Sequence, residues 1–333
     1  MKYTDQVYGK TEITDPVILE LISCPALQRL KDIDQAGYLP IWKISDHHIN
    51  EYDHSRFAHS VGVYLLLRNY GAPLEEQIAG LIHDVSHSAF SHCIDYVLDV
   101  GSEKEHNHQD NFFDVYIRKT QIPEIIEKYG FDPDYIFNDK NFPLEEKELP
   151  DLCADRIDYS LRTATIFKVI NEQDKKYILK NLIAERTNWL FKDLKSAKKY
   201  ARLFFKLNKI YYAGLDSAVM FRTVGDWLKY ALQKGYIEKD DLYTTDKIVT
   251  AKINKYLDKD EYLKLLWDRM NKKIKTTNNP KNYDAQVYCK SRIVDPLFSD
   301  KGVVKRVSEA EPSWKDTVQR ELKPKRYFLK FEK

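Results

Sequence analysis

The stretch QIAGLIHDVSHSAFSHCIDY, residues 77–96, places an imidazole beside a carboxylate at the end of an apolar helical run. These two residues are His83 and Asp84, and His87 and His92 follow in the same stretch. Adjacent ionisable groups on a core-type helix cost free energy unless they pair or bind a cation. A His-Asp pair is common in proteins, so on its own it is a weak sign of a metal site.

Two other segments add ionisable groups to helices that otherwise have the composition of a protein core. RFAHSVGV, residues 56–63, has His59 three residues after Arg56, and this spacing puts both on one helical face. DRIDYSLR, residues 155–162, begins with Asp155 on an otherwise apolar helix. The three segments together place several imidazoles and carboxylates in core-type helices, and such groups must pair with one another or bind a cation.

Hydrophobic periodicity predicts a mainly helical protein. The expected helices span residues 15–36, 56–70, 74–85, 88–99 and 150–167, followed by a long run over 195–235 that breaks near Gly214 or Gly225. Thr14 is the expected N-cap of the first helix. Strand patterns are few and fall at residues 38–45, at residues 184–192 and in the final KRYFLKFE. We therefore expect a mainly α fold with minor β pairs.

Composition places the chain among ordinary globular proteins. Its 333 residues are 43% hydrophobic and 31% charged, which excludes a disordered or collagen-like chain. No stretch approaches the roughly 20 apolar residues of a membrane span, and the first residues lack the apolar core of a signal peptide. The four cysteines have no CxxC spacing, which favours inert thiols in a reducing cytoplasm over a cysteine zinc site.

Charge is distributed unevenly along the chain. The overall net charge is +2, but residues 1–180 carry −12 and residues 181–333 carry +14. All nine histidines lie in the acidic part, as a divalent metal site there would require. The basic part could attract a nucleotide or a nucleic acid, although lysines interleaved with apolar residues are also typical of solvated helix faces.

The ordered motifs resemble those of the HD-domain phosphohydrolases, whose signature H…HD…D corresponds to His59, His83, Asp84 and Asp155. The similarity is closest to the deoxynucleoside-triphosphate triphosphohydrolase branch, which includes bacterial dGTPases and the sterile-alpha-motif/HD-domain dNTPase. It rests on ALQRLKDIDQAGYL, SRFAHSVGVYLL, QIAGLIHDVSHSAFSHCID and ADRIDYSLR, with a weaker match in IVDPLFSDKGVVKRVSE. The motifs cover most of residues 13–170.

This resemblance implies an HD-domain helical core over residues 1–180 and a basic, mostly helical region over residues 181–333 packed on it. It also implies one divalent ion (Mn, Fe, Ni, Zn or Mg) held by the four signature residues. The family pattern favours Asp155 as the last ligand, whereas helical periodicity alone leaves Asp158 open.

The resemblance also assigns roles near the phosphates. His87, His92 and His106 are the expected acid/base or phosphate-contacting residues, and an imidazole suits proton transfer near neutral pH. The motif around His106 departs from the family pattern, since Asn107 replaces Glu and Asp110 replaces Ser. For this reason His108 remains a rival to His106.

Substrate contacts follow from the same comparison. Arg56, Arg156 and Tyr159 match phosphate-contacting positions, and Gln35 matches a nucleoside contact. Tyr211 is the candidate for the residue that packs against the sugar, with Tyr212 as the alternative. Ala36 is smaller than the usual residue, which predicts looser exclusion of a ribose.

The favoured function is hydrolysis of a deoxynucleoside triphosphate to deoxynucleoside and triphosphate. Two alternatives stay open: an HD phosphohydrolase acting on a nucleoside monophosphate, cyclic nucleotide or oligonucleotide, and a low-turnover module that binds nucleotides or nucleic acid. By analogy with relatives, we expect a homo-oligomer.

Overall fold

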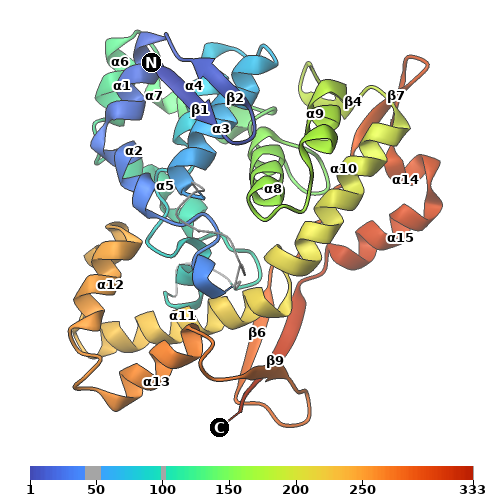
Figure 1. The fold of residues 1–333 in the computed structure, drawn as a ribbon. Coiled ribbons are helices and arrows are strands. Elements are labelled where there is room, and N and C mark those ends of the chain that lie inside the picture. The colour runs from blue at the N-terminus through green and yellow to red at the C-terminus, as the bar shows by residue number, and fades with distance from the viewer. Residues whose placement is uncertain (42–53, 99–102, 333) are drawn as a thin grey trace.

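The computed structural model describes residues 1–41, 54–98 and 103–332 and is built mainly of helices (Figure 1). The helices of the first half are α1 (Pro16–Ser23), α2 (Pro25–Arg29), α3 (Arg56–Asn69), α4 (Leu74–Ile82), α5 (His108–Ile117), α6 (Ile122–Lys128), α7 (Pro133–Ile136), α8 (Ala154–Ile166) and α9 (Glu172–Asn181). The second half contributes α10 (Leu194–Leu207), α11 (Leu215–Gln233), α12 (Asp246–Asn254), α13 (Glu261–Met270), α14 (Val307–Ala310) and α15 (Pro312–Glu321). The predicted mainly α class is confirmed.

The strands form small sheets around the helices. They are β1 (Lys2–Asp5), β2 (Gly9–Glu12), β3 (Leu182–Glu185), β4 (Asn188–Phe191), β5 (Thr276–Asn278), β6 (Ala285–Cys289), β7 (Leu297–Asp300), β8 (Val303–Arg306) and β9 (Lys325–Phe331). β1 and β2 make an antiparallel hairpin, and the orders of the other two sheets are β3-β4-β7-β8 and β5-β9-β6. Only the β4–β7 pair is parallel within the part of the chain that the structure describes.

Several predicted boundaries are wrong for local reasons. The expected helix over 15–36 is interrupted at Cys24, whose backbone is extended because a residue before proline is pushed out of the helical region. Asp15 precedes this helix as N-cap, in place of Thr14. Leu39–Ile41 forms a 3₁₀ turn where a strand was expected, and the rest of the 38–45 segment lies outside the described residues.

Two more predictions change in detail. The helix expected over 88–99 is a 3₁₀ segment, η4 (Ser91–Tyr96), preceded by Phe90 at a φ of 60°. The single strand expected over 184–192 is the hairpin β3–β4. The long helical run breaks at Gly214, after a π-helical turn, η6 (Asn208–Tyr212). A Cβ on Gly214 would lie 2.5 Å from the Ile210 carbonyl oxygen, so this junction requires glycine.

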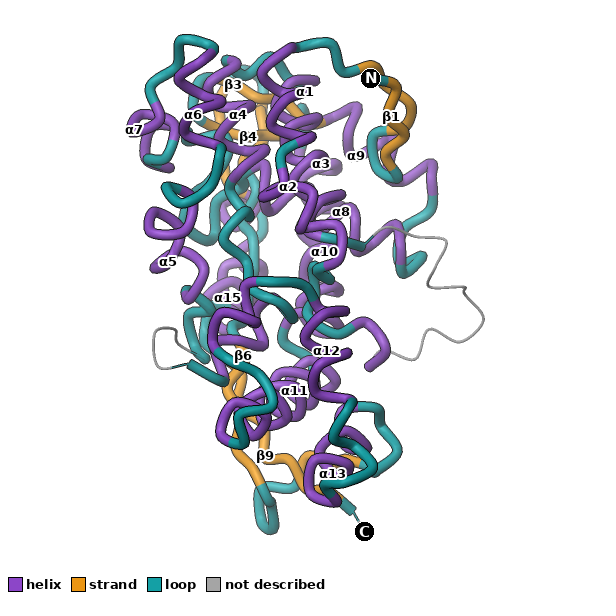
Figure 2. The backbone as a smooth tube through the Cα atoms, turned by 90° about the vertical axis from the view of Figure 1, so that its left-hand side faces the viewer, coloured by secondary structure: helices purple, strands orange, loops and turns teal. Residues whose placement is uncertain are grey.

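The hydrophobic core joins both halves of the sequence. One buried cluster combines residues of η4 with α11, α13 and β6, and another combines α3 and α8 with α10 and the segment around Ile293. α11 runs beneath the N-terminal helices in Figure 1, and the two termini lie at opposite ends in both Figures 1 and 2. The division at residue 180 does not separate two hydrophobic cores, and it stays a prediction about domains.

Two glycines let α3 approach its neighbours closely. A Cβ on Gly80 of α4 would lie 2.5 Å from Leu67 of α3, and a Cβ on Gly62 of α3 would overlap Arg162 Nη2 and Asp158 Oδ1 of α8. α3 thereby packs tightly against both α4 and α8, the helices that carry or precede His83 and Asp155.

We expect Gly62→Ala to lower the free energy of unfolding by about 2–4 kcal/mol, because the new methyl group must displace a buried ion pair. Helix propensity alone predicts the opposite sign, a gain of about 0.5–1 kcal/mol. Urea unfolding monitored by circular dichroism measures the difference. An unchanged or more stable variant would contradict the close approach of α3 and α8.

Candidate metal centre and catalytic cavity

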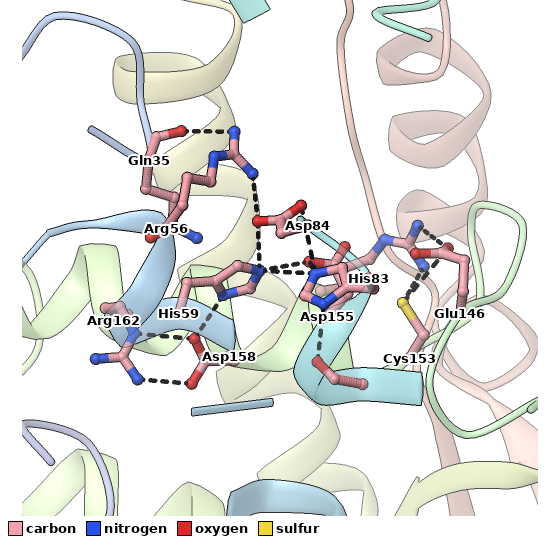
Figure 3. A network of polar contacts seen from close by, with 12 residues as sticks. Gln35, Arg56, His59, His83, Asp84, Glu146, Cys153, Asp155, Asp158 and Arg162 are labelled. Carbon is pink, nitrogen blue, oxygen red and sulfur yellow. Dashed lines mark hydrogen bonds and ion pairs between the residues drawn. The ribbon is translucent and has the colours of Figure 1, made fainter. Parts of the chain in front are cut away.

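The four residues of the predicted metal site come from three helices and converge in space (Figure 3). His59 lies in α3, Asp155 in the first turn of α8, and His83 and Asp84 at the C-terminal end of α4. His59 Nε2 is 2.9 Å from Asp155 Oδ1 and 3.3 Å from His83 Nε2. His83 Nε2 is 3.5 Å from both Asp84 Oδ1 and Asp155 Oδ1.

Hydrogen bonds on the far side of each imidazole set its orientation. His83 Nδ1 donates to the Gly80 carbonyl oxygen at 2.8 Å, and His59 Nδ1 donates to Asp158 Oδ2 at 2.7 Å. In a neutral ring the Nε2 atom then carries the lone pair. Both Nε2 lone pairs therefore face the same point as the carboxylates, which is the arrangement of a metal-binding pair of histidines with partners behind it.

The ligand atoms of His59, His83 and Asp155 all lie within 4.8 Å of one another, as a single bound ion requires. Asp84 borders this group: its Oδ2 is 3.7 Å from His59 Nε2 and accepts a 2.8 Å hydrogen bond from Arg56 Nη1. The donor set of two imidazoles and two carboxylates fits a divalent transition metal or Mg²⁺.

Electrostatics in the site also call for a cation. Burial lowers the pKa of His83, but the carboxylates of Asp84 and Asp155 outweigh it and raise that pKa well above its usual value. Burial raises the pKa of Asp84, but Arg56, His83 and His87 outweigh it and hold that pKa well below its usual range. Positive charge at this point is thus strongly favourable, and a divalent ion supplies it.

A buried ion-pair chain supports His59 from behind. Asp158 accepts from Arg162 Nε at 2.9 Å, and Arg162 Nη2 donates to Asp5 Oδ2, also at 2.9 Å. Asp158, Arg162 and Asp5 are all buried. The Asp158 carboxylate therefore already accepts hydrogen bonds from His59 Nδ1 and Arg162. The Asp155 carboxylate is the one that faces the Nε2 atoms of His59 and His83. This geometry favours Asp155 over Asp158 as the ligand, in line with the prediction from the family pattern.

The Arg56 side chain is buried and already hydrogen-bonded to protein groups, which restricts its direct contact with a substrate. Its nitrogens donate to Asp84 Oδ2, to Ser91 Oγ at 3.0 Å and to the Gln35 carbonyl oxygen at 2.8 Å. The side chain is buried, so in this structure it braces Asp84 and the η4 segment. Its predicted phosphate contact remains a prediction.

The three predicted catalytic histidines form a row that leads away from Asp84. His87 Nε2 is 3.2 Å from Asp84 Oδ1, and the ring centroids of His87 and His92, and of His92 and His106, are each 5.1 Å apart. Burial lowers the pKa of His87 to about 4, and burial lowers the pKa of His92 and His106 well below the usual value. In the folded protein these imidazoles are neutral at pH 7.

The row includes one residue that the sequence interpretation missed. Asp95 Oδ2 lies 3.5 Å from His92 Nδ1, and burial raises the pKa of Asp95 to about 7. The signal was present in SHCID, where Asp95 follows His92 by one helical turn. His108, the rival of His106, instead points its Nε2 to the Tyr243 hydroxyl, 3.1 Å away.

His83, Asp84, Asp155 and the row of His87, His92 and His106 line one cavity of about 950 Å³, and His59 lies buried behind its wall. Its walls include the predicted substrate residues, namely Gln35, Ala36, Arg56, Arg156, Tyr159, Tyr211 and Tyr212. The ring of Tyr211 stacks on that of Phe167, with ring centroids 4.5 Å apart. The hydroxyl oxygen of Tyr159 is buried. Arg156 Nη1 donates to the carbonyl oxygens of Lys147 and Asp151, so part of its guanidinium is already engaged.

Comparisons with known proteins show which family the chain belongs to. No family model matches the chain. It is 32% identical to the uncharacterized protein YdhJ of Bacillus subtilis over 93% of each chain, and 30% identical to the metal-dependent phosphohydrolase cns2 of Cordyceps militaris over 72% of this chain and 68% of that one. The chain belongs to the metal-dependent phosphohydrolases. The predicted membership among HD-domain phosphohydrolases, and with it a hydrolase activity, is confirmed.

A solved structure shares the fold of this phosphohydrolase, and a more distant relative is similar over part of the sequence. A phosphohydrolase structure from Bacteroides thetaiotaomicron superposes over the whole of both chains with a TM-score of 0.71 and 18% identity. The human deoxynucleoside triphosphate triphosphohydrolase SAMHD1 is 31% identical over 39% of this chain and 23% of its own length. Among the described residues, no helix has the length and hydropathy needed to cross a membrane.

We expect the phosphohydrolase to lose stability below pH 6.5, in part through His106. The unfolded chain protonates this imidazole near pH 6.5, whereas the folded protein keeps it neutral, so the free energy of unfolding falls as the pH falls. His106→Gln should remove up to about 1.4 kcal/mol per pH unit of that slope between pH 6.5 and 5. Urea unfolding at several pH values gives the slope.

Tyr96→Phe serves as the control, because Tyr96 contacts His106 through its hydroxyl group, 3.1 Å from Nε2, and the variant keeps the imidazole. The control should retain the slope of the unmodified protein. Equal slopes in the protein with and without His106 would show that this imidazole is not held neutral by burial.

Proposed function

We propose that this phosphohydrolase hydrolyses deoxynucleoside triphosphates to deoxynucleoside and triphosphate. The observation that carries the proposal is the convergence of His59, His83 and Asp155, of which His83 and Asp155 line a large cavity that also holds neutral histidines and aromatic side chains. The partial similarity to SAMHD1, which is named a deoxynucleoside triphosphate triphosphohydrolase, supports the choice of substrate class.

In this proposal His59, His83, Asp84 and Asp155 hold one divalent ion. When bound, such an ion polarises a phosphoryl oxygen and lowers the pKa of a bound water. Arg56 keeps the Asp84 carboxylate in place through its 2.8 Å ion pair. Asp158 keeps His59 turned toward the site through the hydrogen bond at Nδ1.

The histidine row handles protons. Water attacks the α-phosphorus, the bond from this phosphorus to the 5′ oxygen breaks, and the 5′ oxygen takes up a proton. A neutral imidazole accepts a proton from water, and the corresponding imidazolium can donate one to the leaving oxygen. His87 and His92 each have a carboxyl group beside the ring, Asp84 at 3.2 Å and Asp95 at 3.5 Å, and such a neighbour stabilises the protonated form.

The sugar and base are assigned to the part of the cavity wall that Gln35, Phe167 and Tyr211 form. Tyr211 and Phe167 offer a stacked aromatic surface, and Gln35 has a buried side-chain oxygen with no hydrogen-bond partner among the described residues. An amide oxygen of this kind accepts a hydrogen bond from a nucleoside donor group. Ala36 beside it leaves more room than a larger side chain, so we expect weak discrimination between deoxyribose and ribose.

The alternative substrates, the oligomeric state, nucleic-acid binding and the location of the protein are also proposals. Monophosphates, cyclic nucleotides or oligonucleotides are alternative substrates, because cns2 is named only as a metal-dependent phosphohydrolase. Assembly into a homo-oligomer, nucleic-acid binding by the basic second half, and a cytoplasmic location rest on analogy and composition.

We expect Asp84→Ala and Asp155→Ala to lose the bound metal and to lower turnover about 10³-fold or more. Metal content is measured by elemental analysis, and turnover by chromatography on a panel of dNTPs, NTPs and NMPs. Inorganic triphosphate should appear from dNTPs in the unmodified protein. Asp114→Asn is the matched control, since Asp114 lines the cavity but pairs with Arg118 on the surface.

Full turnover in metal-free Asp155→Ala would exclude the metal site as the reaction centre. Release of orthophosphate alone, or turnover of only NMPs or cyclic nucleotides, would contradict the triphosphohydrolase proposal and leave the general phosphohydrolase assignment intact.

A further inference from the structure

A pair of cationic side chains from the C-terminal region lines the catalytic cavity. Lys290 and Arg292 follow strand β6 and share the cavity wall with His92, His106 and Arg156. Neither belongs to a motif that suggested a site in the sequence. They are separated from the HD stretch by almost 200 positions, so only the fold brings them to the histidine row.

A buried amide holds this pair in position. Asn208, at the start of the π-helical turn η6, is fully buried. Its Nδ2 donates to Ser291 Oγ at 3.0 Å, and its Oδ1 accepts from the backbone N–H of Arg292 at 2.8 Å. On the other side, the antiparallel pairing of β6 with β9 fixes the chain up to Cys289. The backbone that carries Lys290 and Arg292 is thus anchored at both ends.

The two cations lie in a partly desolvated position with like charge around them. Burial lowers the pKa of Lys290, and Arg292 lowers it further; Asp110 and Glu105 act in the opposite direction, and Arg156 adds a smaller lowering effect. Within the described part of the chain, no carboxylate lies at ion-pair distance from either side chain. Half-buried cations without a paired anion are unfavourable, and a ligand that supplies negative charge relieves this cost.

The neighbouring cluster of His92, Asp95 and His106 has ligand atoms within 4.8 Å of one another and could be read as a second metal site. The charges argue against it. Arg292 and Lys290 are among the groups that keep His106 unprotonated, after burial itself, so the local field opposes positive charge. An anion fits this end of the cavity better than a cation.

We propose that Lys290 and Arg292 bind the terminal phosphates of the substrate and so select a triphosphate over a monophosphate. This inference rests on the proposed function, because it takes the α-phosphorus to lie at the metal end and the rest of the chain of phosphates to run along the histidine row. Arg292 offers a planar fork for phosphate oxygens, and Lys290 adds a second point charge. Asn208 is a positioning residue that acts through Arg292.

The test measures binding of inorganic triphosphate and of orthophosphate to the metal-loaded protein by titration calorimetry, with the divalent ion in excess over the probe. K290Q/R292Q should bind triphosphate about 10- to 100-fold more weakly, while its orthophosphate affinity changes less than about threefold. The matched control is K301Q/K315Q, which removes the same charge at exposed positions in the same half of the chain. It should bind both probes as the unmodified protein does.

Asn208→Ala adds a readout for the positioning role: it should weaken triphosphate binding selectively, with both cations still present. Equal triphosphate affinity in K290Q/R292Q and in the unmodified protein would overturn the inference, as would an equal loss in K301Q/K315Q. These binding results do not depend on turnover. If dNTPs are hydrolysed and the cationic pair proves inert, this inference fails and the proposed function stands. If none of the dNTPs, NTPs and NMPs is hydrolysed, the proposed function fails, whatever the result of the binding experiment.

Discussion

The structure depends on one constraint: two imidazole nitrogens, His59 Nε2 and His83 Nε2, are held 3.3 Å apart beside buried carboxylates. Such a group is stable only if positive charge occupies the point where the side chains meet. The close approach of α3 to α4 and α8, permitted by Gly80 and Gly62, brings His59, His83 and Asp155 together. The rest of the local structure supports this point, from the Asp158–Arg162–Asp5 chain behind His59 to the Arg56 brace on Asp84.

Much of the site could be predicted from the sequence because the motifs are local. The His83-Asp84 pair lies at the end of a periodic apolar run, and each of the other two ligands lies in a helix with its own pattern. The structure brings His59, His83 and Asp155 within 4.8 Å of one another, with Asp84 beside them, and their role as metal ligands stays a prediction. The helix break at Cys24 could also have been predicted from the sequence, since Pro25 disfavours a helical conformation at the preceding residue.

The remainder depends on contacts that are distant in sequence. The Arg56 side chain has the charge of a phosphate contact, yet the fold surrounds it with acceptors from Gln35, Asp84 and Ser91. In the sequence, Lys290 and Arg292 look like the many other cations of the basic half. In the structure, hydrogen bonds from Asn208 to Ser291 and Arg292 hold their segment at the cavity. Neither outcome follows from spacing or composition. The first is set by how the segments of Gln35, Asp84 and Ser91 pack around Arg56, and the second by how the C-terminal region packs on the HD helices.

The measurement that tests the central claim most directly is X-ray absorption fine structure at the edge of the metal in the loaded protein. We predict one ion per chain with two imidazole ligands and oxygen donors, and a fall to one imidazole in His83→Gln. A spectrum without imidazole scattering, or one that His59→Gln and His83→Gln both leave unchanged, would contradict the convergence of these helices on a bound ion.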